Sequence, residues 1–158
     1  MKTIVTTIIC LAFFFLISSC RIARTFQIEC NSVSADATYV VDVLVESKKE
    51  LSNLGPVKLD AIDGVLFRGI TGSNCVTQKP IIGMSKAQVR KNRLIKNIYG
   101  NRKGYEKYVT NISVISKSPI TYTAKQTFQY KYRIAINKDL LRKDLVAAGL
   151  IKSLNDGF

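Results

Sequence analysis

The sequence predicts an α+β fold: a mainly antiparallel sheet with one long strand in the C-terminal half of the chain, covered by about three helices. Residues 38–46 are rich in β-branched side chains, and residues 120–136 alternate in polarity with period two; both patterns are typical of strands. Segments that begin at Pro56, Ser85 and Asn137 place apolar residues at helical spacing. The order β-α-(β)-α-β-β-α indicates helices packed over a sheet.

The first 19 residues are predicted to be an export signal. Lys2 is the only charged residue before Arg21, and an apolar run of about 14 residues, 4–17, is followed by two serines. A basic start, an apolar middle and small residues at the cut are the order of a secretory signal. The run is shorter than the roughly 20 residues that span a bilayer. We therefore expect residues 1–19 to be removed.

The segment Ile17-Ser18-Ser19-Cys20 resembles a bacterial lipobox, in which a peptidase cuts before the cysteine and lipid is attached to its sulfur. Isoleucine stands at a position where leucine is commoner. The resemblance implies a lipoprotein-type signal peptide over 1–19 and a lipid on Cys20. The alternative is an ordinary signal cut near Ser19 or Cys20, which leaves a soluble secreted protein.

The mature chain is expected to be one domain on a short tether. Residues 20–37 show little regular pattern, and we assign them to the lipidated cysteine and the tether, with a single α+β domain over 38–158. Ten residues lead from Cys20 to Cys30, which is at most about 35 Å of extended chain. A domain fixed at Cys30 would therefore hang close to the membrane.

The number of cysteines supports the same interpretation. Cys10 leaves with the signal, and if Cys20 carries lipid, then Cys30 and Cys75 remain as a pair in an oxidising compartment. A bridge between them would close a loop of about 46 residues and contribute about 3–5 kcal/mol in the chain-entropy model. The alternative is two buried free thiols.

The first half of the domain is predicted to contain two helices and a short second strand. Pro56 opens the first helix, because its missing N–H costs nothing at a helix start, and Gly69 ends it. The short strand covers residues 75–78. The capping-box pattern Ser85-Lys86-Ala87-Gln88 starts the second helix, which Gly100 ends.

The second half is predicted to contain two strands and a last helix. The first strand covers residues 108–116, and Ser118-Pro119 forms a turn. The strand over 120–136 is longer than usual, so we expect a bend near residues 125–127. Asn137 caps the last helix. In the first of the two strands, the side chains expected to point inward are Tyr108, Ile112 and Val114.

Basic residues are concentrated in one contiguous region. Residues 79–144 hold sixteen basic and three acidic residues, whereas residues 1–78 hold seven of each, and the whole chain has a net charge of +13. Such a field favours anionic partners, namely an anionic lipid, a glycan or an acidic protein. The alternative is a solvated surface with no specific ligand. The candidate residues are Lys125, Lys131 and Arg133 on the long strand and Arg90, Lys91, Arg93, Lys96, Arg102 and Lys103 on and after the second helix.

The residue types argue against an enzyme. The chain has no histidine, which excludes Ser-His-Asp and Cys-His catalysis and HExxH metal sites, and it has no CxxC, GxGxxG or P-loop motif. We therefore assign no catalytic residue, no metal and no cofactor. The alternative is a histidine-free enzyme that uses carboxylates. Asp60 and Asp63 lie three residues apart on a helix, a spacing more often found on a solvated face.

Nucleic-acid binding is a further alternative, and we expect no such partner. The high pI and the tyrosine-rich strand fit the footprint of a nucleic-acid-binding protein. However, the tyrosines share parity with the core positions Ile134 and Ile136, so we expect them to be buried. An export signal argues against this partner as well.

Residues 61–69 and 140–152 resemble uncharacterised lipoproteins of the Bacteroidota, and the likeness extends over most of the mature chain. The resemblance implies no known activity. The sequence therefore predicts a membrane-anchored envelope lipoprotein that faces the periplasm and acts as a non-enzymatic binding or structural module. Its partners would be the membrane, through the lipid, and an anionic envelope component or acidic protein. A soluble secreted binding protein is the alternative.

Overall fold

The computed structural model describes residues 26–33, 38–72, 75–100, 103–120 and 127–153. Within these ranges, six strands form one sheet in the order β4-β3-β1-β2-β6-β5. Neighbouring strands are antiparallel except β1 and β3, which pair in parallel. The strands are β1 Phe26–Val33, β2 Thr38–Ser47, β3 Ile70–Gly72, β4 Cys75–Gln78, β5 Val109–Ile120 and β6 Thr127–Asn137.

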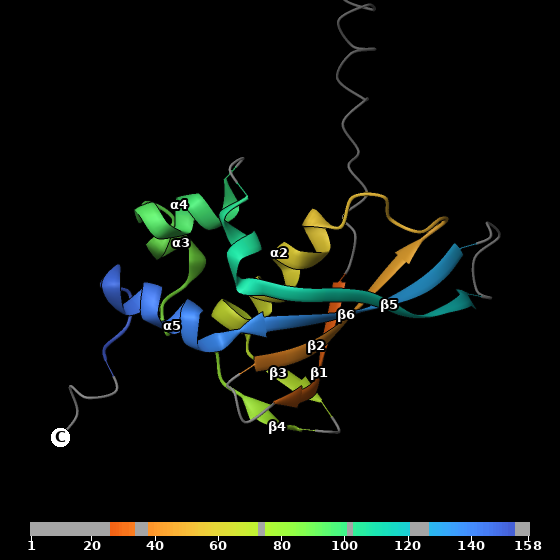
Figure 1. Cartoon of the computed structure of the whole chain (residues 1–158), viewed down its shortest axis with the longest axis horizontal. Helices are drawn as coiled ribbons and strands as arrows, with labels where there is room; N and C mark the ends of the chain where they lie inside the picture. The colour runs from red at the N-terminus through yellow and green to blue at the C-terminus, as the bar shows by residue number, and fades with distance from the viewer. Residues whose placement is uncertain (1–25, 34–37, 73–74, 101–102, 121–126, 154–158) are drawn as a thin grey trace, which may run out of the picture.

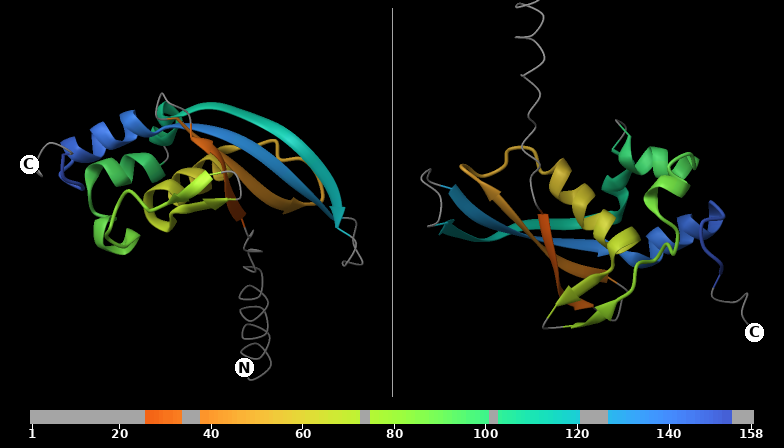
Figure 2. Two further views of the ribbon diagram at one scale, coloured as in Figure 1. Left: turned by 90° about the horizontal axis from the view of Figure 1, so that it is seen from below. Right: turned by 180° about the vertical axis from the view of Figure 1, so that it is seen from behind.

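Helices gather over one face and one end of the sheet, while the β5–β6 hairpin extends away from them (Figures 1 and 2). The predicted α+β fold with a mainly antiparallel sheet is therefore confirmed. In the described part, the α-helices are α2 Gly55–Asp63, α3 Lys86–Val89, α4 Arg93–Tyr99 and α5 Lys138–Ala147. The π-helix η1 Gly64–Arg68 follows α2, and the 3₁₀-helix η2 Gly104–Tyr108 precedes β5.

The core lies between the sheet and the helices, and two neighbouring strands supply most of its sheet side. In β2 and β6, alternate side chains are buried, and the register sets Val41 opposite Ile134 and Val43 opposite Tyr132. Full burial of a valine or isoleucine contributes about 1.5–3 kcal/mol. The parity predicted for the tyrosines of β6 is confirmed. The buried apolar side chains are Tyr39, Val41, Val43 and Val45 in β2 and Tyr130, Tyr132, Ile134 and Ile136 in β6.

The first helix begins and ends as predicted, but its last turn is a π-helix. Pro56 stands in the first turn of α2, and Gly69 follows η1 with φ of +77°, a conformation that favours glycine. In a π-helix, residues five apart lie one turn apart. Asp63 and Arg68 are such a pair, and Arg68 Nε lies 3.5 Å from Asp63 Oδ2.

The predicted short strand and last helix are also present. Residues 75–78 form β4, and α5 begins after Asn137, whose Oδ1 accepts a hydrogen bond from Leu140 N at 2.8 Å. This contact satisfies one of the free N–H groups at the helix start. Gly149, with φ of +67°, follows the helix end.

The prediction of an irregular tether is wrong for residues 26–33, which form strand β1 beside β2. Ile28 and Cys30 pack against the core, and Glu29 lies on the opposite face. The alternation is short because the register shifts between Cys30 and Ser32. A bulge of this kind interrupts the period-two pattern by which strands are predicted.

The long strand predicted over 120–136 is wrong at its start. Ile120 is the last residue of β5 and pairs with Thr127, the first residue of β6. Residues 121–126, and with them most of the predicted bend, lie outside the described residues. Ser118-Pro119, predicted to be a turn, belongs to β5. An edge strand tolerates proline because the missing N–H can be one that faces solvent.

Of the side chains predicted to point inward in this region, one is misplaced. Tyr108 is buried at the end of η2, and Ile112 packs against the core. Val114 is 43% exposed. The register of β5 shifts between Val114 and Ser116, and the helices lie at the other end of the hairpin (Figure 1).

The helix predicted from Ser85 to Gly100 is two short helices, α3 and α4. The capping box is present, and Ser85 N donates to Gln88 Oε1 at 2.8 Å. Asn92 then adopts an extended conformation, and its Oδ1 accepts from Leu94 N at 2.9 Å, which starts a second helix. Asparagine competes with the helical backbone in this way. Gly100 ends α4, as predicted.

Candidate anion-binding surface

The structure separates the candidate basic residues into two groups. One group lies on β6, on the sheet face away from the helices. The other lies on α4 and the short segments on either side of it, and we call it the helical basic surface. The strand group is Lys131 and Arg133, and the helical basic surface is Arg90, Lys91, Arg93, Lys96 and Lys103. Lys125, Arg102 and the lipidation candidate Cys20 lie outside the described residues.

The strand group is neutralised by acidic side chains of neighbouring strands. Arg133 Nε donates to Asp42 Oδ1 at 2.8 Å, and its Nη2 donates to Asp42 Oδ2 at 3.0 Å. Lys131 Nζ lies 3.5 Å from Glu29 Oε2 and 3.8 Å from Asp42 Oδ2. The hydrogen bonds to Asp42 raise the pKa of Arg133. Because two cations meet two anions, this part of the sheet face has no net positive charge.

Strand register explains this arrangement. Asp42 lies directly opposite Arg133 on one side and opposite Glu29 on the other, so the three residues form a row across β1, β2 and β6. Asp42 is only 4% exposed, and a buried carboxylate is costly unless it is paired. Asn31 Nδ2 also donates to it, at 3.3 Å. A lone acid within an apolar strand is visible in the sequence, but its partner 91 residues away is not.

The helical basic surface has no such neutralisation. Its five side chains are exposed, and none forms an ion pair with a residue in the part of the chain that the structure describes. Other cations nearby are held by acids, such as Lys86 by Asp63 and Lys107 by Asp144. The described residues between Arg90 and Lys103 therefore carry five exposed cations that no described acid neutralises.

A groove of about 920 Å³ lies beside these cations, between α4 and α5. Arg93 and Lys96 contribute two unpaired cations to its lining, and Leu94 and two alanines of the α5 end contribute apolar surface. This lining is suited to a ligand that carries an anionic group next to an apolar part. The groove is lined by Asn92, Arg93, Leu94, Lys96, Asn97, Gly100, Lys107, Asp144, Ala147 and Ala148.

Asp144 holds the only carboxylate among these lining residues, and it is already bound. Lys107 Nζ lies 2.6 Å from Asp144 Oδ2, and Tyr108 Oη donates to the same oxygen at 2.7 Å. Burial alone would raise the pKa of Asp144, but these two donors, with Lys143 nearby, hold it below its usual value. Asp144 thus stays ionised and neutralises Lys107, which leaves the positive charge of Arg93 and Lys96 in excess.

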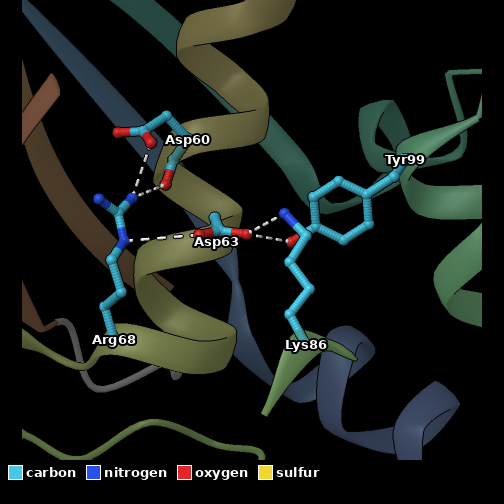
Figure 3. A network of polar contacts seen from close by, with 5 residues as sticks. All are labelled: Asp60, Asp63, Arg68, Lys86 and Tyr99. Atoms are coloured by element: carbon cyan, nitrogen blue, oxygen red, sulfur yellow. Dashed lines mark hydrogen bonds and ion pairs between the residues drawn. The ribbon is translucent and has the colours of Figure 1, made fainter. Parts of the chain in front are cut away.

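A polar network holds the helical basic surface in place (Figure 3). Asp63 Oδ1, at the end of α2, accepts from Lys86 Nζ at 2.5 Å and from Tyr99 Oη at 2.7 Å. Lys86 is the first residue of α3 and Tyr99 the last of α4. Burial and the bond to Asp63 raise the pKa of Tyr99. One carboxylate therefore fixes both ends of the α3–α4 segment against α2.

The same network corrects the interpretation of the paired carboxylates as a solvated helix face. The side chains of Asp60 and Asp63 are 17% and 21% exposed, and Arg68 binds both. Arg68 Nη2 donates to Asp60 Oδ1 at 2.8 Å and to the Asp60 carbonyl oxygen at 2.9 Å. Burial raises the pKa of Asp60, and Arg68 opposes the shift. These contacts join α2, η1 and α3, which is a structural role.

The predicted disulfide is present. Cys30 of β1 and Cys75 of β4 are bonded, with their Cα atoms 6.1 Å apart. The bond links the edge of the sheet to its centre, because β3 lies between β4 and β1. It fixes β1, the first element of the described domain.

No family model, curated protein or solved structure matches this chain. In the described part of the chain, no helix has the length and apolar character needed to cross a membrane.

Proposed function

We propose that this protein is an exported lipoprotein, anchored to a bacterial membrane by lipid on Cys20 and facing the periplasm, which binds an anionic partner without catalysing a reaction. The signal pattern over 1–19 and the lipobox-like segment that follows it support export and anchoring. The Cys30–Cys75 disulfide is compatible with this location, because oxidising compartments preserve such bonds.

The contrast between the two basic groups carries the binding part of the proposal. A cation that is already paired gains little from an anionic ligand, because the ligand must displace its acid. Lys131 and Arg133 are paired in this way, whereas the helical basic surface consists of exposed cations without ion pairs to described residues. The helical basic surface is therefore the better candidate for the partner.

The partner class follows from the chemistry of these side chains. Arginine presents a planar fork that matches a carboxylate or a phosphate, and lysine acts as a point charge. The groove beside Arg93 and Lys96 adds apolar surface through Leu94 and the end of α5. An anionic lipid, an anionic glycan or an acidic protein each supplies groups of this kind, and their binding weakens as salt screens the charges.

The tether is shorter than the sequence pattern predicts, which strengthens the membrane argument. Strand β1 begins at Phe26, six residues after Cys20, so the anchor is at most about 20 Å of extended chain from the sheet. A basic surface on a domain held this close to an anionic leaflet gains about 1 kcal/mol for each cation that reaches it.

Charge reversal tests the surface. The Cys20→Ala protein, released in soluble form, would carry Arg93→Glu and Lys96→Glu, and its binding to phosphatidylglycerol vesicles and to polyglutamate would be measured at low and high salt. We expect both substitutions together to weaken binding to the preferred probe by at least about tenfold. The two probes distinguish a lipid partner from an acidic protein.

The matched control is Lys48→Glu with Lys49→Glu, two exposed cations in the connection between β2 and α2. This pair makes the same change in net charge at another place. We expect it to alter binding by less than about twofold, which corresponds to under about 0.4 kcal/mol. Equal losses in both double variants would mean that net charge, and not the helical basic surface, governs binding.

A further inference from the structure

The sheet has one long open edge, formed by β5. This strand has twelve residues, and in the described part of the chain it pairs only with β6. Figure 2 shows it along the outside of the curved sheet. Its outer side therefore carries a row of backbone N–H and C=O groups without strand partners. The opposite edge, β4, has only four residues.

Apolar side chains are exposed at the middle of this edge. Val114 is 43% exposed and Ile115 is 41% exposed, and they are neighbours in the chain. Ile115 is the residue passed over where the register shifts between Val114 and Ser116. A bulge re-aims the side chains around it. The edge thus offers both backbone hydrogen bonds and apolar contact at one place.

Charge is nearly absent from β5, although its surroundings are strongly basic. Residues 79–144 carry sixteen basic residues, yet Lys117 is the only charged residue among the twelve of β5. Open edges are usually protected by charged side chains, proline or bulges. Here Lys117 and Pro119 lie in the last third of the strand, and residues 109–116 contain two register shifts but no charged residue and no proline.

We infer that residues 112–116 of β5 pair with the same residues of a second copy of this chain, antiparallel and about a twofold axis at Val114. Without Lys2, which leaves with the signal, each molecule has a net charge of +12, and two such molecules approach most easily through a surface without charge, as residues 112–116 provide. An acidic partner would instead favour a cationic edge. With the axis near Val114, Lys117 faces the region of Asn111 and not its own copy, so no like charges meet.

Photocrosslinking of the full-length protein in the bacterial membrane tests this pairing. A p-benzoylphenylalanine in place of Ile115 should give an adduct of twice the protein's mass. The same group in place of Val76, which is 82% exposed on β4, is the matched control and should give none. Absence of the homodimer adduct from position 115, its equal appearance from position 76, or an adduct with a different protein would overturn the inference.

Val114→Lys provides a second arm, because it places two lysines near the axis. We expect it to reduce the adduct from position 115 by about tenfold. The Cys30–Cys75 bond, seen on non-reducing gels, reports that the variant still folds. A third arm uses the unaltered protein in detergent: because salt screens the repulsion between copies, the dimer fraction should rise with salt. A monomer at every salt concentration would contradict the pairing.

Discussion

The guanidinium of Arg133 binds both carboxylate oxygens of Asp42, at 2.8 and 3.0 Å, although 91 residues separate them in the chain. The pair joins β6 to β2 on the sheet face away from the helices. A basic residue is available to an anionic partner only when no acid already holds it. Because Arg133 is already paired with Asp42, the strand group adds little unpaired positive charge. The unpaired cations are those of the helical basic surface.

The Asp42–Arg133 pair should be energetically coupled. We expect Asp42→Asn to lower the free energy of unfolding by about 1–3 kcal/mol. The substitution removes the negative charge that pairs with the Arg133 guanidinium at a buried position. Arg133 is 39% exposed, so solvent moderates the loss. A double-mutant cycle with Arg133→Gln, measured by urea unfolding, should give a coupling of about 1 kcal/mol or more. Strictly additive losses would show that the contact is not stabilising.

The disulfide should contribute much of the stability of the domain. Cys30 and Cys75 are 45 positions apart, a loop for which the chain-entropy model gives about 3–5 kcal/mol. We expect Cys30→Ala with Cys75→Ala to lower the thermal midpoint markedly. A reducing agent should lower the midpoint of the unaltered protein in the same way and should leave the double variant unchanged. A midpoint insensitive to both changes would contradict this role.

Stability should fall in alkaline solution because of two hydrogen-bonded phenols, Tyr108, which is buried, and Tyr99, which is partly buried. Tyr99 and Tyr108 donate to Asp63 and Asp144, and burial together with these bonds raises the pKa of both above the ordinary 10.0. Above about pH 10 the unfolded chain loses these protons first, so the folded state binds more protons and stability decreases as pH rises. Below that pH the contribution is fully present.

Removal of one phenol should make this decrease shallower. We expect Tyr99→Phe to cost about 1 kcal/mol at neutral pH, through loss of the hydrogen bond to Asp63, and to reduce the slope of unfolding free energy against pH above about pH 10. Urea unfolding at a series of alkaline pH values gives both quantities. An identical slope in the variant and the unaltered protein would mean that Tyr99 titrates normally.

The proposed anchor depends on one sulfur atom. We expect Cys20→Ala to move the protein from the membrane fraction to the soluble periplasmic fraction. Cys10→Ala is the matched control, since that residue lies in the part of the signal that is removed, and it should leave the protein in the membrane fraction. If the Cys20→Ala protein stayed with the membrane, the lipid anchor would be excluded. If the unaltered protein were itself soluble, the secreted alternative would hold.

Elements that are set by a few neighbouring residues were predictable from the sequence. Elements that depend on pairing with distant strands were not. The start of α2 at Pro56, the cap of α5 at Asn137 and the buried parity of β6 each follow from a few neighbouring residues. Strand β1 was missed because its alternation is cut short by the bulge after Cys30. The β5–β6 hairpin was misread because Pro119, a turn residue by composition, is tolerated on an edge strand.

The candidate surface was predictable as a region but not as a site. The sequence shows where cations are concentrated, because charge can be counted. Which of these cations are free depends on contacts between residues far apart in the chain, such as Asp42 with Arg133 and Asp63 with Lys86. The groove between α4 and α5 likewise arises from two segments about fifty residues apart, which no local pattern relates.

Amide hydrogen exchange of the protein with and without its preferred anionic probe tests the central claim most directly, because it locates the contact without altering any charge. If the helical basic surface binds the partner, protection should increase over residues 86–103 and stay unchanged over residues 129–133 of β6. Increased protection over 129–133, with none over 86–103, would contradict the account and assign the partner to the strand group.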